Sequence, residues 1–413
     1  MKKAPFSIED IKSLEKDYKT PFYIYDERAI RENARRFQEA FSWVPGGYKN
    51  FFAVKANPNP HILNILKEEA MGADCSSMAE LVIAEKVGLS GEEIMFTSNN
   101  TPAEEFEKAQ KLGAIINFDD IAHIEFFKKN IGPLPDLVSL RFNPGPLKSG
   151  NEIIGNPSDA KFGLRKDQLF EAYEILKKEG VSRFALHTMV VSNMLEMDYL
   201  LDTASMLFNL AVEIKDSLGI KIELINLGGG IGIPYRPGDK PVDIYKLGKS
   251  IETLYNDILV PAGLGSTKIV SENGRAILGP FGFLITKVRH KFSKYKDYIG
   301  VDANMSDLMR PGIYGAYHHV EVLGKESLEK NKIYDVVGSL CENNDKFAVD
   351  RSLPKEIEPG DYLVIFDAGA HGHAMGFNYN GKLRPAEFLL TEEGKFKLIR
   401  RAETLDDYFA TIV

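Results

Sequence analysis

An alternation of short apolar runs with longer helical patterns, from Lys49 to about Asn273, constrains the fold of this chain more than any other feature. A helical pattern follows nearly every run, which predicts parallel strands joined by right-handed crossovers. Eight such units close a (β/α)8 barrel, although an open doubly wound sheet would also fit. The expected strands are Asn50–Val54, Gly72–Cys75, Ile94–Thr97, Ala114–Phe118, Leu137–Phe142, Phe184–Val190, Ile222–Leu227 and Ile269–Ser271. The expected helices include His61–Ala70, Ala79–Val87, Pro102–Leu112, Asp167–Lys178 and Met197–Leu218.

The pattern changes after Pro280, where strand-like runs are separated by turn residues and helical patterns are sparse. Such runs predict a second, mostly β domain. The apolar run Thr20–Asp26 precedes the barrel and is a candidate to pair with this domain. We place the barrel at residues 28–280, and the β domain at residues 1–27 and 281–413. The expected C-terminal strands are Phe283–His290, Tyr298–Val301, His319–Val322, Ile333–Ser339 and Tyr362–Phe366.

Composition excludes several classes of protein. Hydrophobic residues make up 44% of the 413 residues, which is enough for a large core. A net charge of −8 with no basic patch argues against a nucleic-acid partner. A secreted disulfide framework of this length would use more than two cysteines. No apolar run has the length of a membrane span or follows the pattern of a signal peptide, so we expect a cytoplasmic protein with no membrane partner.

Reactive side chains occur where the predicted barrel strands end, which is where barrel enzymes carry their catalytic groups. They are Lys55, Asp74, Arg141, His187, the triplet Gly228–Gly230 and Glu272. Each has an ordinary structural explanation when taken alone. A lysine at a strand end usually reaches solvent, a histidine in an apolar strand is usually structural, and a glycine triplet is usually a tight turn. Their shared position on one rim favours a functional site.

A lysine at the mouth of a barrel can form a Schiff base with a carbonyl group. Burial beside Phe51 and Phe52 is expected to lower the pKa of Lys55 and free its amine. The backbone N–H groups of Gly228–Gly230 suit a phosphate, and Glu272 could pair with a pyridine nitrogen. These needs match pyridoxal 5'-phosphate. No G-x-G-x-x-G pattern opens a helix, which argues against a nicotinamide cofactor.

Four short motifs strengthen this interpretation because they are specific in combination and in order. They are Ala53-Val54-Lys55-Ala56-Asn57, Asn226-Leu227-Gly228-Gly229-Gly230, Glu272-Asn273-Gly274-Arg275 and Cys341-Glu342-Asn343-Asn344-Asp345. With them the chain resembles the fold-type III pyridoxal-phosphate-dependent diaminopimelate/ornithine decarboxylase family. The resemblance extends from Thr20 to Asn380. It implies an α/β fold in which a (β/α)8 barrel of alanine-racemase type precedes a mostly β C-terminal domain.

The resemblance also implies roles for individual residues. Lys55 would bind the cofactor covalently, His187 would stack on its ring, and Glu272 would hold the pyridine nitrogen. Cys341 would donate the proton that replaces the departing carboxylate. In this family Cys341 and Glu342 come from the partner subunit, which implies a homodimer. The remaining expected cofactor contacts are Asp74, Ser192, Gly229, Gly230, Gly274, Arg275 and Tyr379, and we expect no metal ligand.

The segment Asn304–Tyr314 is similar to the diaminopimelate enzymes of this family, where the arginine equivalent to Arg310 binds the distal carboxylate. A guanidinium fork is the natural partner of a carboxylate. The ordinary alternative for Arg310 is a solvated charge in a loop. The resemblance implies decarboxylation of meso-2,6-diaminopimelate to L-lysine, in lysine biosynthesis. The other expected substrate contacts are Arg275, Tyr314, Glu342 and Tyr379.

The chain departs from the family pattern at three places. His187 is followed by Thr188-Met189-Val190-Val191-Ser192, where the family has His-x-Gly-Ser with a phosphate-binding serine. Asn273 replaces a proline, and His371-Gly372-His373 replaces a more usual aromatic residue. These changes keep two alternatives open: a decarboxylase of another diamino acid, a D-amino acid or a carboxylated polyamine, or a non-catalytic regulator that binds the cofactor. Retention of Cys341 argues against the regulator, and Glu272 argues against a racemase.

Overall fold

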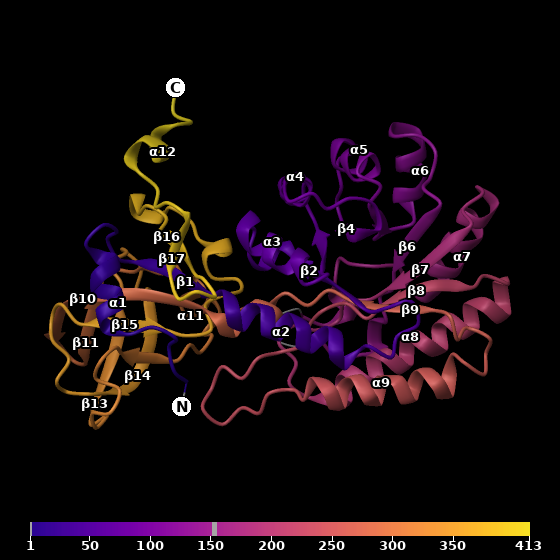
Figure 1. The fold of residues 1–413 in the computed structure, drawn as a ribbon. Coiled ribbons are helices and arrows are strands. Elements are labelled where there is room, and N and C mark those ends of the chain that lie inside the picture. Colours follow the sequence, from indigo (N-terminus) through magenta and orange to yellow (C-terminus); the bar gives the residue numbers. More distant parts are fainter. Residues whose placement is uncertain (1, 151–154) are drawn as a thin grey trace. The chain divides into compact units, whose positions relative to one another are not determined.

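The computed structural model describes residues 2–150 and 155–413, which divide into two compact units (Figure 1). The barrel unit consists of Arg31–Ile233 and Lys240–Ile277. The β unit consists of the N-terminal residues up to Ile30, the segment Pro234–Asp239 and the C-terminal part Leu278–Val413. No helix in the described ranges combines the length and the apolar character needed to cross a lipid bilayer.

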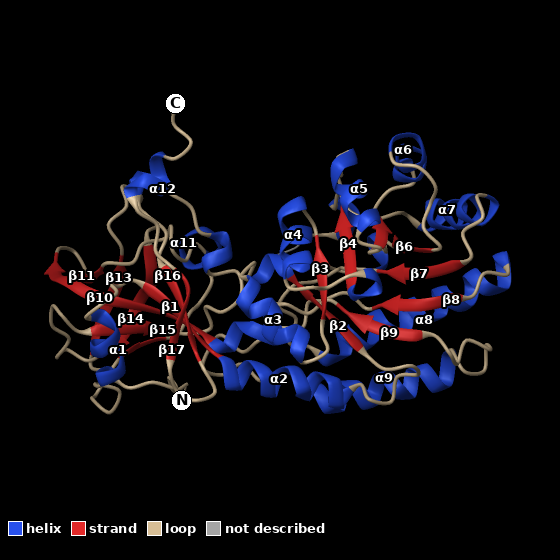
Figure 2. Ribbon diagram, turned by 45° about the horizontal axis from the view of Figure 1, so that its top comes forward, coloured by secondary structure: helices blue, strands red, loops and turns tan. Residues whose placement is uncertain are grey.

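Eight parallel strands close into a barrel in chain order from β2 to β9, with helices alternating between them (Figure 2). The predicted (β/α)8 barrel is therefore confirmed. The strands are β2 (Lys49–Ala53), β3 (Gly72–Cys75), β4 (Ile94–Ser98), β5 (Ile115–Phe118), β6 (Leu137–Arg141), β7 (Arg183–His187), β8 (Ile222–Asn226) and β9 (Lys268–Ser271). The helices are α2 (Glu27–Ala40), α3 (Pro60–Glu68), α4 (Met78–Lys86), α5 (Ala103–Lys111), α6 (Ala122–Asn130), α7 (Lys166–Lys178), α8 (Met197–Leu218), α9 (Ile244–Ile258) and α10 (Arg275–Leu278).

The interior of the barrel is filled by one buried side chain from each of seven strands. This layer consists of Phe51, Met95, Ile115, Leu137, Ala185, Leu224 and Val270. The remaining strand, β3, contributes Gly72 opposite Phe51, and a Cβ at Gly72 would lie 2.7 Å from the Phe51 ring. The glycine therefore makes room for the largest side chain of the layer. Because this layer is packed, polar chemistry is expected near the ends of the strands and in the loops that follow them.

One predicted strand of the barrel is too long. Phe184–Val190 was expected to be extended throughout, but β7 ends at His187. The chain turns there because Phe142 N–H donates to the carbonyl oxygen of His187, and the Thr188 hydroxyl donates to the carbonyl oxygen of Phe142. The residues after His187 form a loop, so they are available to the site.

The β unit contains a sheet of nine strands in which β1 lies between β10 and β16. β1 pairs with β10 antiparallel and with β16 in parallel, so the expected pairing of Thr20–Asp26 with the C-terminal part is confirmed. The strands are β1 (Phe22–Asp26), β10 (Gly282–Ser293), β11 (Asp297–Val301), β12 (Val320–Val322), β13 (Lys332–Val337), β14 (Lys346–Leu353), β15 (Tyr362–Ile365), β16 (Ala386–Leu390) and β17 (Phe396–Arg400). The helices are α1 (Ile8–Glu15), α11 (Arg310–Tyr314) and α12 (Leu405–Phe409).

Candidate active site

Lys55 lies in a short 3-10 turn, Val54–Ala56, directly after β2. Its Nζ is 3.4 Å from Oδ2 of Asp74, because the β2–β3 register places Ala53 opposite Asp74. The Lys55 side chain is 54% exposed, whereas that of Asp74 is 2% exposed. The other carboxylate oxygen of Asp74, Oδ1, is buried and has no hydrogen-bond partner among the described residues. An accessible amine therefore lies beside a buried carboxylate.

The expectation that burial lowers the pKa of Lys55 is wrong. The negative charge of Asp74 raises the pKa of the Lys55 amine, and Glu272 adds to this effect, so that together they outweigh the opposing effect of burial. Burial, followed by the nearby charge of Glu272, raises the pKa of Asp74. The pair therefore favours a protonated amine beside the Asp74 carboxylate.

A second buried carboxylate, Glu272, follows β9. His187 Nε2 lies 3.1 Å from its Oε2, and Asn226 Nδ2 donates to its Oε1 at 2.7 Å. Burial opposes ionisation, but the favourable charge and hydrogen bond of His187, together with Lys55 and Asn226, lower the pKa of Glu272. This carboxylate is therefore ionised and can hold a cationic partner.

Asn117 sets the orientation of His187. Asn117 Nδ2 lies 2.8 Å from Nδ1 of His187, and the other ring nitrogen, Nε2, lies 3.1 Å from Glu272 Oε2, so the ring is held from both sides. The amide comes from β5, the imidazole from β7 and the carboxylate from the end of β9. Sequence reasoning missed Asn117, although a polar residue within an otherwise apolar strand was a possible signal.

The loop after β8 contains three glycines that pack closely against neighbouring backbone. A Cβ at Gly228 would lie 2.2 Å from Thr188 O, one at Gly229 would lie 2.6 Å from Glu272 O, and one at Gly230 would lie 2.5 Å from Val191 O. Gly228 and Gly230 also adopt positive φ angles of 70° and 95°. These contacts explain why no side chain is present along this loop. The expectation that no side chain obstructs the backbone N–H groups of this loop is wrong for Gly228 and Gly229, because Gly228 N–H donates to Asn226 Oδ1 at 2.9 Å and Gly229 N–H donates to Met189 Sδ at 3.3 Å.

An amide clamp, formed by Asn50 and the backbone of Asn273, holds the chain directly after Glu272. Asn50 Oδ1 accepts from Asn273 N–H at 2.8 Å, and Asn50 Nδ2 donates to Asn273 O at 3.0 Å. The Ser271 hydroxyl also donates to Asn50 Oδ1, at 2.8 Å. A proline in place of Asn273 would lack the N–H group. Sequence reasoning noted the exchange at Asn273 but missed Asn50, whose signal is an amide in the first apolar run.

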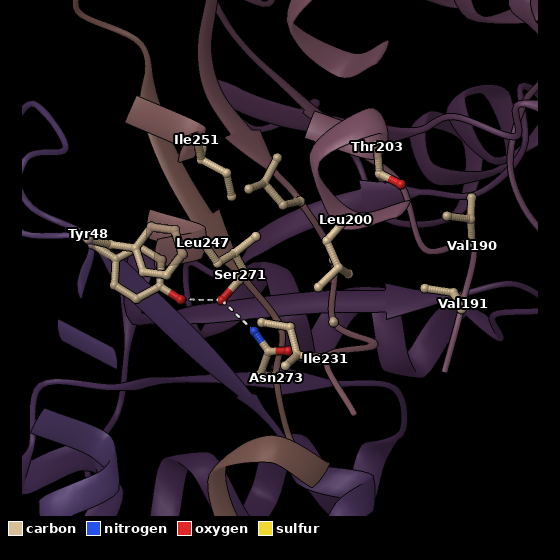
Figure 3. Close-up of a pocket in the computed structure, with 14 residues that line it drawn as sticks. Tyr48, Val190, Val191, Leu200, Thr203, Ile231, Leu247, Ile251, Ser271 and Asn273 are labelled. Atoms are coloured by element: carbon tan, nitrogen blue, oxygen red, sulfur yellow. Dashed lines mark hydrogen bonds between the residues drawn. The ribbon is translucent and has the colours of Figure 1, made fainter. Parts of the chain in front are cut away.

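A pocket lies on the side of the Gly228–Gly229 loop that faces α8 and α9, with about 540 Å3 of open space, part of it continuous with solvent. Figure 3 shows its polar edge, where Tyr48, Ser271 and Asn273 are hydrogen-bonded in series. The remaining lining is mainly apolar and consists of Phe41, Val190, Val191, Leu200, Thr203, Leu227, Gly228, Gly229, Ile231, Leu247 and Ile251. Val190 and Val191, two of the bulky residues that follow His187, therefore line this pocket together with the glycine loop.

Ser192 and Arg275 meet beside this loop, with Arg275 Nη2 3.5 Å from Ser192 Oγ. Gly274 precedes Arg275, and a Cβ there would lie 2.8 Å from the Ala56 Cβ. The barrel unit thus brings together the predicted residues Lys55, Asp74, His187, Ser192, Gly229, Gly230, Glu272, Gly274 and Arg275. Within the described ranges, no group of His, Cys, Asp and Glu side chains is arranged to hold a metal ion.

The other predicted residues belong to the β unit. Arg310 begins α11 and is 5% exposed. The alternative interpretation, that Arg310 is a solvated charge in a loop, is therefore wrong. Cys341 is exposed, and its N–H donates to Asn380 Oδ1 at 2.7 Å. Glu342 is exposed as well, and it accepts a hydrogen bond from Asn344 N–H at 3.1 Å. Tyr314 and Tyr379 are 60% and 47% exposed.

Comparison with known proteins identifies the family. The family model for the pyridoxal-dependent decarboxylase, pyridoxal binding domain, matches residues 27–279. The chain belongs to the pyridoxal-dependent decarboxylase family. Diaminopimelate decarboxylase from Methanothermobacter thermautotrophicus is 36% identical over 96% of this chain and 92% of the relative. Protein TabA from Pseudomonas amygdali pv. tabaci is 42% identical over 96% of this chain and 91% of that protein.

Solved structures agree with this assignment. Diaminopimelate decarboxylase from M. jannaschii in complex with L-lysine has a TM-score of 0.88 and 30% identity, covering 97% of this chain and 94% of that one. The Helicobacter pylori enzyme, also complexed with L-lysine, has a TM-score of 0.85 and 30% identity, covering 97% and 98%. The chain is accordingly a pyridoxal-phosphate-dependent decarboxylase.

The residues of this decarboxylase fit pyridoxal 5'-phosphate. An accessible lysine amine supplies the covalent attachment, and the ionised Glu272 matches a protonated pyridine nitrogen. The loop Gly228–Gly230 carries no side chains, and the guanidinium of Arg275 beside it is a natural partner of a phosphate. The buried, unpaired Oδ1 of Asp74 is a further acceptor at the same rim.

Replacing Asp74 tests the electrostatics of this rim. Asp74→Asn removes the charge that most raises the pKa of Lys55, so the pKa of Lys55 should fall and more of the amine should be unprotonated at neutral pH. The pH dependence of Lys55 acetylation in cofactor-free protein, followed by mass spectrometry, should shift to lower pH. Asp136→Asn, at an exposed carboxylate, serves as the control. An unchanged profile in Asp74→Asn would show that Asp74 does not control this amine.

Proposed function

We propose that this decarboxylase converts meso-2,6-diaminopimelate to L-lysine, as a cytoplasmic homodimer in lysine biosynthesis. The observation that carries the proposal is the buried, oriented guanidinium of Arg310 within a segment that resembles the diaminopimelate enzymes. A buried arginine fork suits a second carboxylate on the substrate. The relatives and solved structures named diaminopimelate decarboxylase support the same substrate.

The barrel residues would bind and orient the cofactor, each at a different part of it. Pyridoxal phosphate, when bound, supplies an electron sink that stabilises the charge left on carbon as carbon dioxide departs. Lys55 would hold the cofactor, and Asp74 would lie beside its amine. Glu272 would keep the pyridine nitrogen protonated, which strengthens the sink. Gly228–Gly230 and Arg275 would hold the phosphate, which would fix the position of the pyridine ring of the cofactor.

The β-unit residues would act on the substrate. Arg310 would bind the distal carboxylate, so that the other end of the diamino acid reaches the cofactor. Cys341, whose backbone is anchored to Asn380 in an exposed loop, would deliver a proton to the carbon that loses carbon dioxide. The exposure of Cys341 and Glu342 suits residues donated to a partner subunit, which supports the homodimer. Tyr314, Tyr379 and Glu342 would complete the substrate contacts.

A second candidate is decarboxylation of a different diamino acid or of a carboxylated polyamine. The altered segment Thr188–Ser192 favours it. A panel of substrates separates the two candidates. Carbon dioxide release should be fastest with meso-diaminopimelate, and roughly 100-fold or more slower with L-ornithine, which lacks the distal carboxylate. Faster release from L-ornithine or from a carboxylated polyamine would favour the second candidate.

Cys341→Ala tests the proton donor. Losing a positioned general acid should reduce kcat by ~100- to 10,000-fold, while pyridoxal phosphate uptake and its absorbance stay unchanged, since Cys341 lies outside the barrel residues that hold the cofactor. Asn343→Ala, at an exposed position of the same loop, is the matched control. Normal turnover by Cys341→Ala would remove Cys341 from the mechanism.

A further inference from the structure

The environment of Arg310 contains a histidine to which neither the sequence nor the family resemblance drew attention. His318 is fully buried, and its Nε2 lies 2.8 Å from Nη1 of Arg310. Its other ring nitrogen, Nδ1, lies 2.8 Å from the carbonyl oxygen of Phe366, at the end of β15. Tyr235 covers both groups, with its ring centroid 4.6 Å from the Arg310 guanidinium carbon and 5.2 Å from the His318 ring. All four residues belong to the β unit.

The protonation of His318 follows from its partners. A carbonyl oxygen can only accept, so Nδ1 carries the hydrogen that Phe366 receives. A guanidinium group can only donate, so Nε2 is the bare nitrogen that accepts from Arg310. His318 is therefore a neutral imidazole that uses both nitrogens at once. The hydrogen bond to the Phe366 carbonyl oxygen sets the orientation of the His318 ring. The His318 ring in turn orients Arg310 through the hydrogen bond at Nε2.

Arg310 is consequently constrained in two ways. The Tyr235 ring fixes the position of the guanidinium plane, and the bond to His318 fixes its rotation within that plane. A guanidinium binds a carboxylate well only when its donors point in the right direction. Because Tyr235 and His318 already restrict the Arg310 side chain, it loses less conformational entropy when it binds a carboxylate.

We propose that His318 is a positioning residue that orients Arg310 for the distal carboxylate of the substrate. The inference rests on the proposed function, because it assigns that carboxylate to Arg310. In His318→Leu, Arg310 loses a buried acceptor that constrains its rotation. In His318→Gln, the amide offers one donor and one acceptor, as the neutral imidazole does.

The experiment compares two ligands that differ in the distal carboxylate. L-lysine, the proposed product, retains that carboxylate, whereas 1,5-diaminopentane lacks it. In His318→Leu holoenzyme, the inhibition constant of L-lysine and the KM of meso-diaminopimelate should both rise about tenfold or more, with kcat changed much less. The inhibition constant of 1,5-diaminopentane should not change. His318→Gln should restore L-lysine binding, and His290→Leu, at an exposed histidine of β10, should have no effect.

A second measurement does not depend on the substrate. The rate at which phenylglyoxal modifies Arg310, mapped by mass spectrometry, should rise in His318→Leu and remain near the native rate in His318→Gln. Tyr235→Leu, which removes the other constraint, should also raise the rate and provides a separate variant if His318→Leu fails to fold. Pyridoxal phosphate uptake and the melting temperature report folding.

The outcomes separate this inference from the proposed function. If the native enzyme does not act on meso-diaminopimelate but His318→Leu exposes Arg310 to phenylglyoxal, the substrate assignment fails and the positioning of Arg310 by His318 stands. If the native enzyme does act on it, but folded His318→Leu keeps native L-lysine inhibition and native phenylglyoxal reactivity, the inference about His318 is overturned.

Discussion

A buried negative charge at the end of β9 is the constraint on which the barrel site depends. Removing a carboxylate from water strongly disfavours its ionised form unless other groups compensate. For Glu272 the compensation comes from His187 on β7, Asn226 on β8 and Lys55 after β2. Only a closed barrel brings the first and last strands together, and the register of Asn50 with Ser271 makes that closure. The closed fold and the ionised carboxylate therefore support each other.

The barrel could be predicted because parallel strands buried on both faces are nearly continuous apolar runs in the sequence. The carboxyl ends of those runs located Lys55, Asp74, His187 and Glu272. The β unit was harder to predict, because charged residues interrupt its strands. β16 contains the buried Glu387, whose partners include Tyr25 and Arg400, and such partners are not visible from local sequence. β14, which contains Asp350 and Arg351, was missed for the same reason.

The electrostatics of Lys55 show where sequence reasoning failed. Apolar neighbours indicated burial, and burial alone would lower the pKa of Lys55. The effect that dominates comes from Asp74, which lies beside Lys55 through the pairing of β2 with β3. Strand register is a tertiary property, so the sign of the shift could not be obtained from the residues around Lys55. The amide clamp of Asn50 on Asn273 was missed for a similar reason.

The departures from the family pattern affect the two units differently. In the barrel, Val190 and Val191 pack behind the glycine loop and Asn273 joins the amide clamp, so these exchanges leave Lys55 and Glu272 in place. Selection of the substrate is assigned to the β unit, where Arg310 is held by His318 and Tyr235. Cofactor chemistry and substrate choice can thus vary separately in this fold.

The central claim is that Lys55 is the residue that holds the cofactor. Purified protein loaded with pyridoxal phosphate is reduced with borohydride, digested, and its labelled peptides are sequenced by mass spectrometry. The reduced cofactor should be found on Lys55. Labelling of a different lysine, or a folded protein that takes up no pyridoxal phosphate, would contradict it.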